Sequence, residues 1–375
     1  MELDITWFLL GLPLAFVLGW LASRLDLRQL RIDNRRSPKA YFKGLNHLLN
    51  EQQDEAIDAF IEAVQKDPDT SELHFALGNL FRRRGEYDRA VRVHEHLLAR
   101  GDLPGPEHER AQHALALDYL QAGLLDRAEE ALGKLEGGKF ETQARLARLA
   151  IYERTRDWPQ AERVAAQLQA SGQGDFSTRA AHYLCEQAIA QAPDEQRATL
   201  LKAIGLAPQS GRAYIALAEL AKRTGDHNEA LNRLLAGIKS APSATPLIAN
   251  EMAQLAIQTQ RHSEALSVLQ AIYDSTHSLD VLQALAQLRR DADGGNALQT
   301  QQLAHLKKEP SLVIAADWLK AQGTQADVQR ALDKATKPLL RYRCASCGFE
   351  ASQHFWQCPG CQSWDSYSTR RVEEL

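Results

Sequence analysis

The chain has 375 residues and a formal net charge of −4 at pH 7; 44% of its residues are hydrophobic, 7% aromatic and 25% charged. This balance is typical of a folded globular protein and excludes a disordered or collagen-like chain. The nearly neutral charge argues against nucleic-acid binding over most of the surface, and the length allows two or three domains or one long repeat array.

The first predicted element is an uncharged apolar segment, 5–22. As a helix of 18 residues it would extend about 27 Å, close to the thickness of the hydrocarbon core of a bilayer. Trp7 and Trp20 lie near its two ends, where indole rings favour the membrane interface. We therefore expect residues 1–22 to form a transmembrane anchor.

The charges on either side of this segment predict its orientation. Glu2 and Asp4 precede it, whereas a cleaved signal peptide, the alternative, would carry positive charge there. Basic residues stay on the cytoplasmic side of a membrane, so we expect a single-pass protein with its N-terminus outside and its bulk in the cytoplasm. Segment 23–36 either contacts anionic head groups or only fixes the topology. Its arginines are Arg24, Arg28, Arg31, Arg35 and Arg36.

Between 37 and 337 the chain repeats a pair of helices. Gly44 and Gly78 are 34 residues apart, as are Ala56 and Ala90. In several pairs a glycine closes the first helix and an alanine follows five residues later: Gly85 with Ala90, Gly123 with Ala128, and Gly225 with Ala230. The period resembles that of the tetratricopeptide repeat. We expect an all-α superhelix whose groove binds peptides or protein elements, with further helical pairs continuing through 278–337.

No pattern in this array indicates catalysis. The sequence has no nucleophile elbow, Walker loop, zinc-protease motif or plausible carboxylate pair, so we assign no catalytic and no cofactor-binding residue. Cys185 lies among apolar positions of a first helix, and we expect it to be a packed core thiol.

The last element is a small module, 338–375, with two CxxC pairs separated by ten residues. Two such pairs complete a tetrahedral four-sulfur site for zinc or a single iron ion. Because cysteine would occupy every position, the site is expected to be structural. Two disulfides are the alternative, but the spacing favours a metal and a reduced compartment. The predicted ligands are Cys344, Cys347, Cys358 and Cys361.

The order of anchor, basic segment, repeat array and doubled CxxC resembles the lipopolysaccharide assembly protein B (YciM) family of Gram-negative bacteria. Four strings carry the resemblance, at 77–86, 118–129, 341–349 and 356–361. The module is also similar to the knuckles of rubredoxin. Its gap between the knuckles is shorter than rubredoxin's, which leaves iron or zinc open.

The resemblance implies a non-catalytic adaptor of the bacterial inner membrane that regulates lipopolysaccharide synthesis. The implied mechanism is to promote degradation, by the membrane protease FtsH, of the deacetylase that commits precursors to lipid A. A lipopolysaccharide-sensing membrane protein and other lipopolysaccharide-synthesis proteins are further implied partners.

Two other functions remain as alternatives. One is a general membrane-tethered scaffold or chaperone with other protein clients, which the groove would serve equally well. The other is a zinc ribbon that binds nucleic acid through basic and aromatic side chains. We favour a core role for these aromatic residues and expect no nucleic-acid partner. The residues concerned are Arg341, Arg343, Phe349, Phe355 and Trp356.

Overall fold

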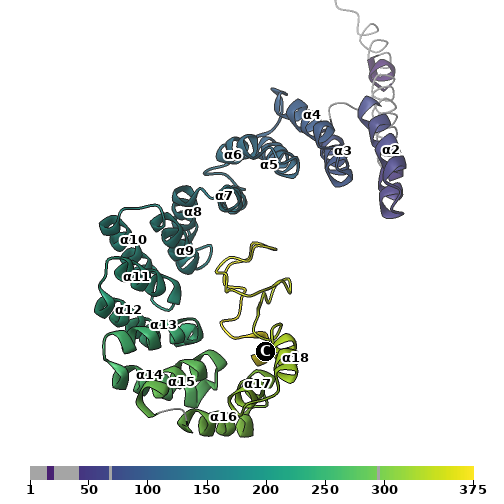
Figure 1. Cartoon of the computed structure of the whole chain (residues 1–375). Helices are drawn as coiled ribbons and strands as arrows, with labels where there is room; N and C mark the ends of the chain where they lie inside the picture. The colour runs from purple at the N-terminus through teal and green to yellow at the C-terminus, as the bar shows by residue number, and fades with distance from the viewer. Residues whose placement is uncertain (1–14, 21–41, 67–69, 294–295) are drawn as a thin grey trace, which may run out of the picture. The chain divides into compact units, whose positions relative to one another are not determined.

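A computed structural model describes residues 15–20, 42–66, 70–293 and 296–375. The described chain is helical almost throughout (Figure 1), in agreement with the predicted all-α repeat fold. The only strands among the described residues are β1 (Tyr342–Arg343) and β2 (Glu350–Ala351). A helix covers 42–49, and the helices after it are α2 (Gln53–Lys66), α3 (Ser71–Arg84), α4 (Tyr87–Leu98), α5 (Gly105–Gln121), α6 (Leu125–Gly133), α7 (Glu141–Thr155), α8 (Trp158–Ala170), α9 (Ser177–Ala188), α10 (Pro193–Leu206), α11 (Gly211–Arg223), α12 (His227–Ser240), η1 (Pro242–Ala244), α13 (Thr245–Gln258), α14 (His262–Thr276), α15 (Leu279–Asp293), α16 (Asn296–Lys308), α17 (Leu312–Ala321), α18 (Ala326–Thr336) and η2 (Val372–Glu374).

The predicted anchor, 1–22, and the basic segment, 23–36, lie outside the described residues except for 15–20, which are helical. Among the helices that are described, none is both long enough and apolar enough to cross a membrane.

The 34-residue period appears in the packing of each helix pair. A Cβ atom on Gly44 would lie 2.8 Å from the Phe60 ring, and one on Gly78 would lie 2.5 Å from the His94 ring. Both glycines and both rings are related by the same 34-residue offset. Glycine therefore lets a bulky side chain of the second helix pack directly on the backbone of the first.

The predicted turns between paired helices are confirmed. Gly85, Gly123 and Gly225 have φ angles of 83°, 76° and 82°, a left-handed conformation that glycine adopts at little cost. The alanines five residues after them are fully buried in the helix contact: Ala90, Ala128 and Ala230.

Two further pairs make the same turn without glycine. Arg156 follows α7 with a φ of 60°, and Gln260 follows α13 with a φ of 58°. Each is followed five residues later by a buried alanine, Ala161 or Ala265. The repeat geometry is thus retained where its sequence signature is degenerate, and the expected helices of 278–337 are present as α15–α18.

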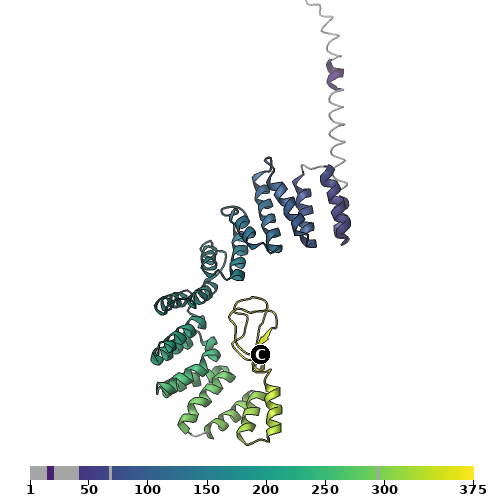
Figure 2. The same ribbon diagram turned by 45° about the horizontal axis from the view of Figure 1, so that its top comes forward.

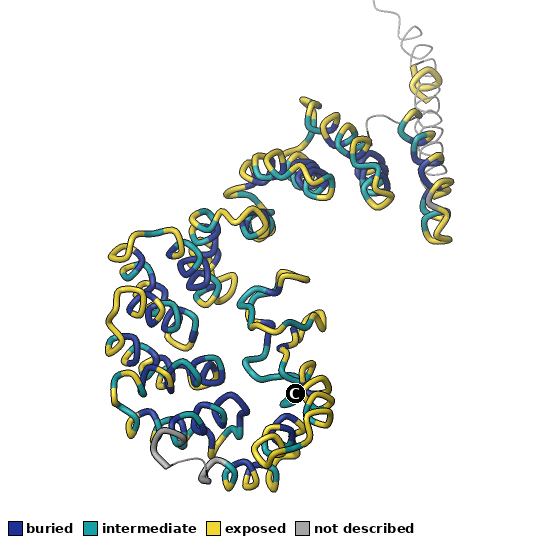
Figure 3. The backbone as a smooth tube through the Cα atoms, viewed as in Figure 1, coloured by how far each residue is buried: buried dark blue, intermediate teal, exposed yellow. Residues whose placement is uncertain are grey.

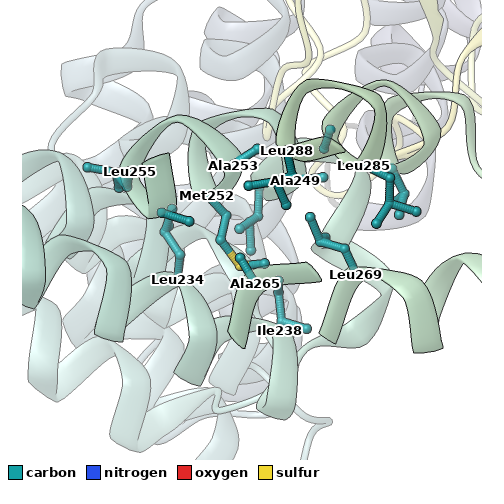
Figure 4. Close-up of a cluster of buried hydrophobic side chains, with 14 of the residues drawn as sticks. Leu234, Ile238, Ala249, Met252, Ala253, Leu255, Ala265, Leu269, Leu285 and Leu288 are labelled. Atoms are coloured by element: carbon teal, nitrogen blue, oxygen red, sulfur yellow. The ribbon is translucent and has the colours of Figure 1, made fainter. Parts of the chain in front are cut away.

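The chain forms two compact units, Met1–Ile151 and Tyr152–Leu375, here called unit 1 and unit 2. In unit 1, Phe60, Leu77 and Phe81 belong to one buried cluster. In unit 2, the largest cluster is formed by α11–α15 around Leu234, Met252 and Leu269 (Figure 4). Figure 3 shows that buried positions recur where neighbouring helices face one another.

In unit 2, the C-terminal module (338–375) lies on the inner side of the curved row of helices α9–α18 (Figures 1 and 2). Hydrogen bonds connect it to residues as far apart as Glu153 and Val313. The inner face of this row is therefore occupied in part by the chain's own C-terminus.

Candidate metal centre

The first CxxC pair forms a tight knuckle between the two short strands. Strands β1 and β2 pair antiparallel, with Arg343 opposite Glu350. After the knuckle, the Gly348 N–H donates to the Cys344 carbonyl oxygen at 2.9 Å, and Gly348 has a φ of 77°. Glycine is suited to this position because it adopts a left-handed conformation without strain.

The second pair repeats this geometry 14 residues later. The Gln362 N–H donates to the Cys358 carbonyl oxygen at 2.8 Å, and Gln362 has a φ of 61°. Gln362 therefore occupies the position of Gly348 in a conformation that costs a non-glycine residue about 1 kcal/mol or more.

The two knuckles bring all four predicted ligands together, with their Sγ atoms within 4.8 Å of one another. Cys344 and Cys361 Sγ are 3.8 Å apart, and Cys347 and Cys358 Sγ are 3.7 Å apart. Sulfur atoms placed about 2.3 Å from a central ion in a tetrahedron are separated by about 3.8 Å, whereas a disulfide bond is about 2.05 Å long. The distances fit a four-sulfur metal site and not two disulfides.

Hydroxyl and N–H groups around the sulfur atoms favour the thiolate form at two of them. Burial opposes ionisation of Cys344, but the Ser366 hydroxyl, 3.3 Å from its Sγ, and the Cys347 N–H lower the pKa of Cys344 to about 6. The Ser363 hydroxyl and N–H likewise lower the pKa of Cys361. At Cys347 the Phe349 N–H lowers the pKa, but burial and the three neighbouring thiols outweigh it and raise the pKa. The thiolate is the form that binds metals, so two of the four sulfur atoms are prepared for zinc or iron by their hydrogen bonds.

A small aromatic cluster surrounds the centre. Phe355 and Tyr367 meet edge to face, with ring centroids 5.9 Å apart, and His354 lies 4.8 Å from Trp356. Burial lowers the pKa of His354 to about 4, so this ring is neutral at pH 7. Phe355 thus packs against the module's core, and Trp356 lies between His354 and His182 of the repeats. Arg343 pairs with Glu350 at 2.7 Å, and Phe349 is exposed.

Trp364 fastens the module to the repeats. Its Nε1–H donates to Glu153 Oε1 at 2.9 Å, and its ring stacks on His182 with a centroid distance of 5.0 Å. The rings of Trp158 and Tyr183 meet it edge to face. An aromatic side chain held in this way contributes both buried apolar area and a directed hydrogen bond.

The residue after Trp364 makes a second polar contact. Asp365 accepts from His182 Nε2, which lies 2.9 Å from both carboxylate oxygens. Arg212 lies on the other side of the imidazole, with Nη1 3.4 Å from His182 Nδ1, and its guanidinium also covers the Trp364 ring. His182 itself is fully buried.

Farther along the module, an ion pair joins it to α15. Arg371 donates to both carboxylate oxygens of Asp280 at 2.8 Å, and only 3% of Asp280 is exposed. The same guanidinium lies 4.1 Å from the centroid of the Tyr342 ring and donates to the Leu340 carbonyl. Arg371 therefore connects the repeats to both ends of the module.

The last two carboxylates cap helices of the repeat array. Glu374 Oε1 accepts from the Leu279 N–H, at the start of α15, at 3.0 Å. Glu373 Oε1 accepts from the N–H groups of Leu312 and Val313, in the first turn of α17. Negative charge at these positions satisfies unpaired N–H groups and interacts favourably with the helix dipole.

These docking residues were absent from the predicted site, which comprised only the four cysteines. One weak signal for them is that Trp364 is a large aromatic residue in a polar segment. No short-range sequence pattern indicates that Trp364 contacts Glu153 or that Arg371 contacts Asp280, because 211 and 91 residues separate the two pairs. Cys185 was assigned correctly to the core and is 5% exposed.

Family models match three parts of the chain. A model described as "Rubredoxin metal binding domain" matches residues 342–367. Two models described as "Tetratricopeptide repeat" match residues 73–106 and 215–278. None of these three models describes a catalytic domain, in agreement with the prediction that the chain is not an enzyme.

The chain is also similar over nearly its whole length to curated proteins. It is 32% identical to lipopolysaccharide assembly protein B of Escherichia coli (strain K12), covering 95% of each chain. It is 28% identical to the protein of the same name from Haemophilus influenzae, covering 95% of this chain and 96% of the relative. Among solved structures, the Naa15/Naa10 complex bound to HypK-THB matches 81% of this chain and 46% of its own, with 16% identity and a TM-score of 0.44.

Proposed function

This chain belongs to the lipopolysaccharide assembly protein B family, and we propose that it is a non-catalytic adaptor of lipopolysaccharide synthesis at the bacterial inner membrane. It promotes FtsH proteolysis of the deacetylase that commits precursors to lipid A. It also gathers other lipopolysaccharide-synthesis proteins and responds to a lipopolysaccharide-sensing membrane protein. The 32% identity over 95% of both chains is the observation that supports this proposal most directly.

The repeats and the docked module would supply binding surfaces in this proposal. Part of the inner face of unit 2 is covered by the C-terminal module through Trp364 and Arg371. A client of unit 2 would therefore contact a composite surface of helices and module, and loss of the module would change that surface.

The four cysteines would hold one structural iron or zinc ion. Their sulfur separations and the donors around Cys344 and Cys361 support this assignment. The ion would stabilise the fold of a module too small to bury a sufficient core by itself. Its contribution would be folding free energy, with Cys344, Cys347, Cys358 and Cys361 filling the coordination sphere.

The anchor, 1–22, would confine the repeats beside a membrane protease. A tether raises the effective concentration of bound partners without any new contact. The proposed topology places the N-terminus in the periplasm and the rest in the cytoplasm, because arginines follow the apolar segment and acidic residues precede it.

The deciding experiment is the half-life of the deacetylase in the native host after protein synthesis is blocked. We expect a longer half-life when this protein is deleted and when a form lacking residues 1–22 replaces it at native level. Full-length protein expressed from the same locus is the matched control. An unchanged half-life in the deletion strain would refute the proteolytic role, and proteins captured by the full chain would then identify the clients of a general scaffold.

The topology is tested separately with a reporter joined after Leu375 through a flexible linker. We expect the reporter to behave as a cytoplasmic protein. Periplasmic reporter activity would overturn both the orientation and the expectation of a reduced compartment for the cysteines.

A further inference from the structure

A cavity of about 590 Å³ lies between the C-terminal module and the repeats of unit 2. Its repeat side is formed by the N-terminal ends of α9 and α11 and by η1, which precedes α13. Its module side is formed by residues between His354 and Thr369. The volume is in the range of small-molecule sites, which occur preferentially where two domains meet.

Hydroxyl groups are the commonest polar groups in this lining. Each hydroxyl can donate one hydrogen bond and accept others, so the lining can both donate to a ligand and accept from it. They belong to three helix starts and to the module: Ser177, Thr178, Ser210, Ser243 and Thr369, with Tyr367 beside them.

Backbone donors add to these hydroxyls. Helix α11 begins at Gly211, and the side chain of its N-cap residue, Ser210, makes no capping hydrogen bond. The first N–H groups of such a helix have no partner within the helix. At α9, in contrast, Asp175 Oδ1 accepts from the Ser177 N–H at 2.9 Å and from the Ser177 hydroxyl at 2.6 Å.

The charges of the lining disfavour a purely anionic ligand. The lining contains two carboxylates, Asp175 and Asp365, and none of its described residues is a lysine or an arginine. The lining histidine, His354, is neutral at pH 7 because burial lowers the pKa of its imidazole to about 4. A phosphate or carboxylate would therefore meet like charge with no neighbouring cation in the lining, which is unfavourable.

Trp356 is the aromatic part of an apolar surface that also includes Leu206 and Pro208. Trp356 is half-buried and is held by His354 and His182, whose ring centroids lie 4.8 Å and 5.8 Å from its own. A wholly apolar ligand would leave the surrounding hydroxyls and carboxylates without partners, at a cost for each such group. The lining instead suits a molecule with one apolar face and many neutral hydroxyl groups.

We propose that this cavity binds a sugar or another small polyhydroxylated molecule. Asp175 and Asp365 accept hydrogen bonds from ligand hydroxyls, the Ser210 hydroxyl and the start of α11 donate to ligand oxygens, and Trp356 covers the apolar face of the ring. The proposal does not depend on the proteolytic role, because it uses only the geometry of the cavity.

The test uses the full chain, purified with its metal, and three probes that share one sugar ring and differ in charge. Glucose, glucosamine and glucose 1-phosphate are titrated separately by calorimetry and by ligand-observed NMR. We expect glucose and glucosamine to bind, and glucose 1-phosphate to bind at least tenfold more weakly because of the two carboxylates. Failure of all three probes to bind would overturn the proposal, and so would preferential binding of glucose 1-phosphate.

Two variants test whether glucose binds in this cavity. Asp175→Asn keeps an oxygen for the Ser177 N–H but removes the charge, and Ser243→Phe fills the cavity while leaving the Ser243 carbonyl that accepts from Thr369. Each should lower the affinity for glucose at least tenfold with the metal content unchanged. Asp226→Asn is the matched control, since Asp226 caps α12 through the Glu229 N–H at 2.8 Å and is not in the lining. An equal loss in the control, or full affinity in both cavity variants, would refute the assignment.

Discussion

The indole Nε1–H of Trp364 donates a hydrogen bond to Glu153 Oε1 at 2.9 Å across a sequence separation of 211 residues. The Glu153 carboxylate also accepts from Arg179 at 2.6 Å and from the Tyr183 hydroxyl. Three donors on one largely buried carboxylate fix its position, so the module docks against a prearranged acceptor.

Removing this indole should weaken the docking of the module without unfolding the module. We expect Trp364→Ala to weaken docking by about 3 kcal/mol, as is typical for truncation of a packed tryptophan, while one equivalent of metal is retained. Hydrogen exchange should then increase in 338–375 and in α9. Phe349→Ala is the control, because Phe349 is 45% exposed and lies in the same module; an equal effect of both variants would argue against a specific role of Trp364.

The second prediction concerns the ion pair between Arg371 and Asp280. Arg371→Ala leaves a buried carboxylate unpaired and should lower the free energy of unfolding of unit 2 by about 3–5 kcal/mol. Arg371→Lys should lower the free energy of unfolding by less than Arg371→Ala, but it should not reach the wild-type value. Lysine lacks the planar fork that contacts both carboxylate oxygens. Urea unfolding of both variants and of Asp280→Asn checks this; additive effects of Arg371→Ala and Asp280→Asn would contradict direct coupling.

Metal removal should unfold the module and leave the repeats largely intact. Cys347→Ser is expected to release the ion while most of the far-ultraviolet helical signal persists, because the repeats have their own core. The amides of Leu279 and Leu312, which donate to Glu374 and Glu373, should then exchange faster. Elemental analysis gives the decisive result: one equivalent of metal retained by the Cys347→Ser/Cys358→Ser double variant would refute the four-cysteine site.

Replacing Gly348 by alanine and Gln362 by glycine should have opposite effects on how tightly the metal is held. Gly348→Ala forces alanine into a left-handed conformation and should cost about 1 kcal/mol, so a competing chelator should remove the metal at a lower concentration. Gln362→Gly removes the corresponding strain, and the metal should be held at least as tightly as in the wild type. Easier metal loss from Gln362→Gly than from Gly348→Ala would show that side-chain contacts of Gln362 outweigh its backbone conformation.

Thiol alkylation should separate Cys185 from the other four cysteines. Burial raises the pKa of Cys185 to about 11, so only about one molecule in a thousand carries the thiolate at pH 8. The rate at which Cys185 is alkylated should rise about tenfold per pH unit below that pKa, because the thiolate is the reactive form. After chelation four thiols should react rapidly and a fifth only slowly, and Cys185→Ala should remove the slow phase; five equally fast thiols would contradict the assignment.

Local patterns predicted the repeats and the sulfur cluster because both depend on short spacings. Gly85 and Ala90 are five residues apart, and each CxxC knuckle spans four. The turn residues Arg156 and Gln260 themselves carry no compositional signal, because non-glycine residues in a left-handed conformation leave none. Only the alanines five residues later, Ala161 and Ala265, keep the repeat pattern at these turns. Docking was not predictable for a different reason: His182 and Asp365 meet only after the repeats have brought α9 beside the module, and no short-range pattern specifies that encounter.

The carboxylates of Glu373 and Glu374 have a consequence for the order of folding during biosynthesis. Chains generally begin to fold from the N-terminus during translation, yet the N–H groups at the starts of α15 and α17 donate to Glu374 and Glu373, which are synthesised 95 and 61 residues after them. These two helix starts therefore lack their carboxylate partners until the module has also been made. Translation order thus places the capping of α15 and α17 after the formation of the earlier helix pairs.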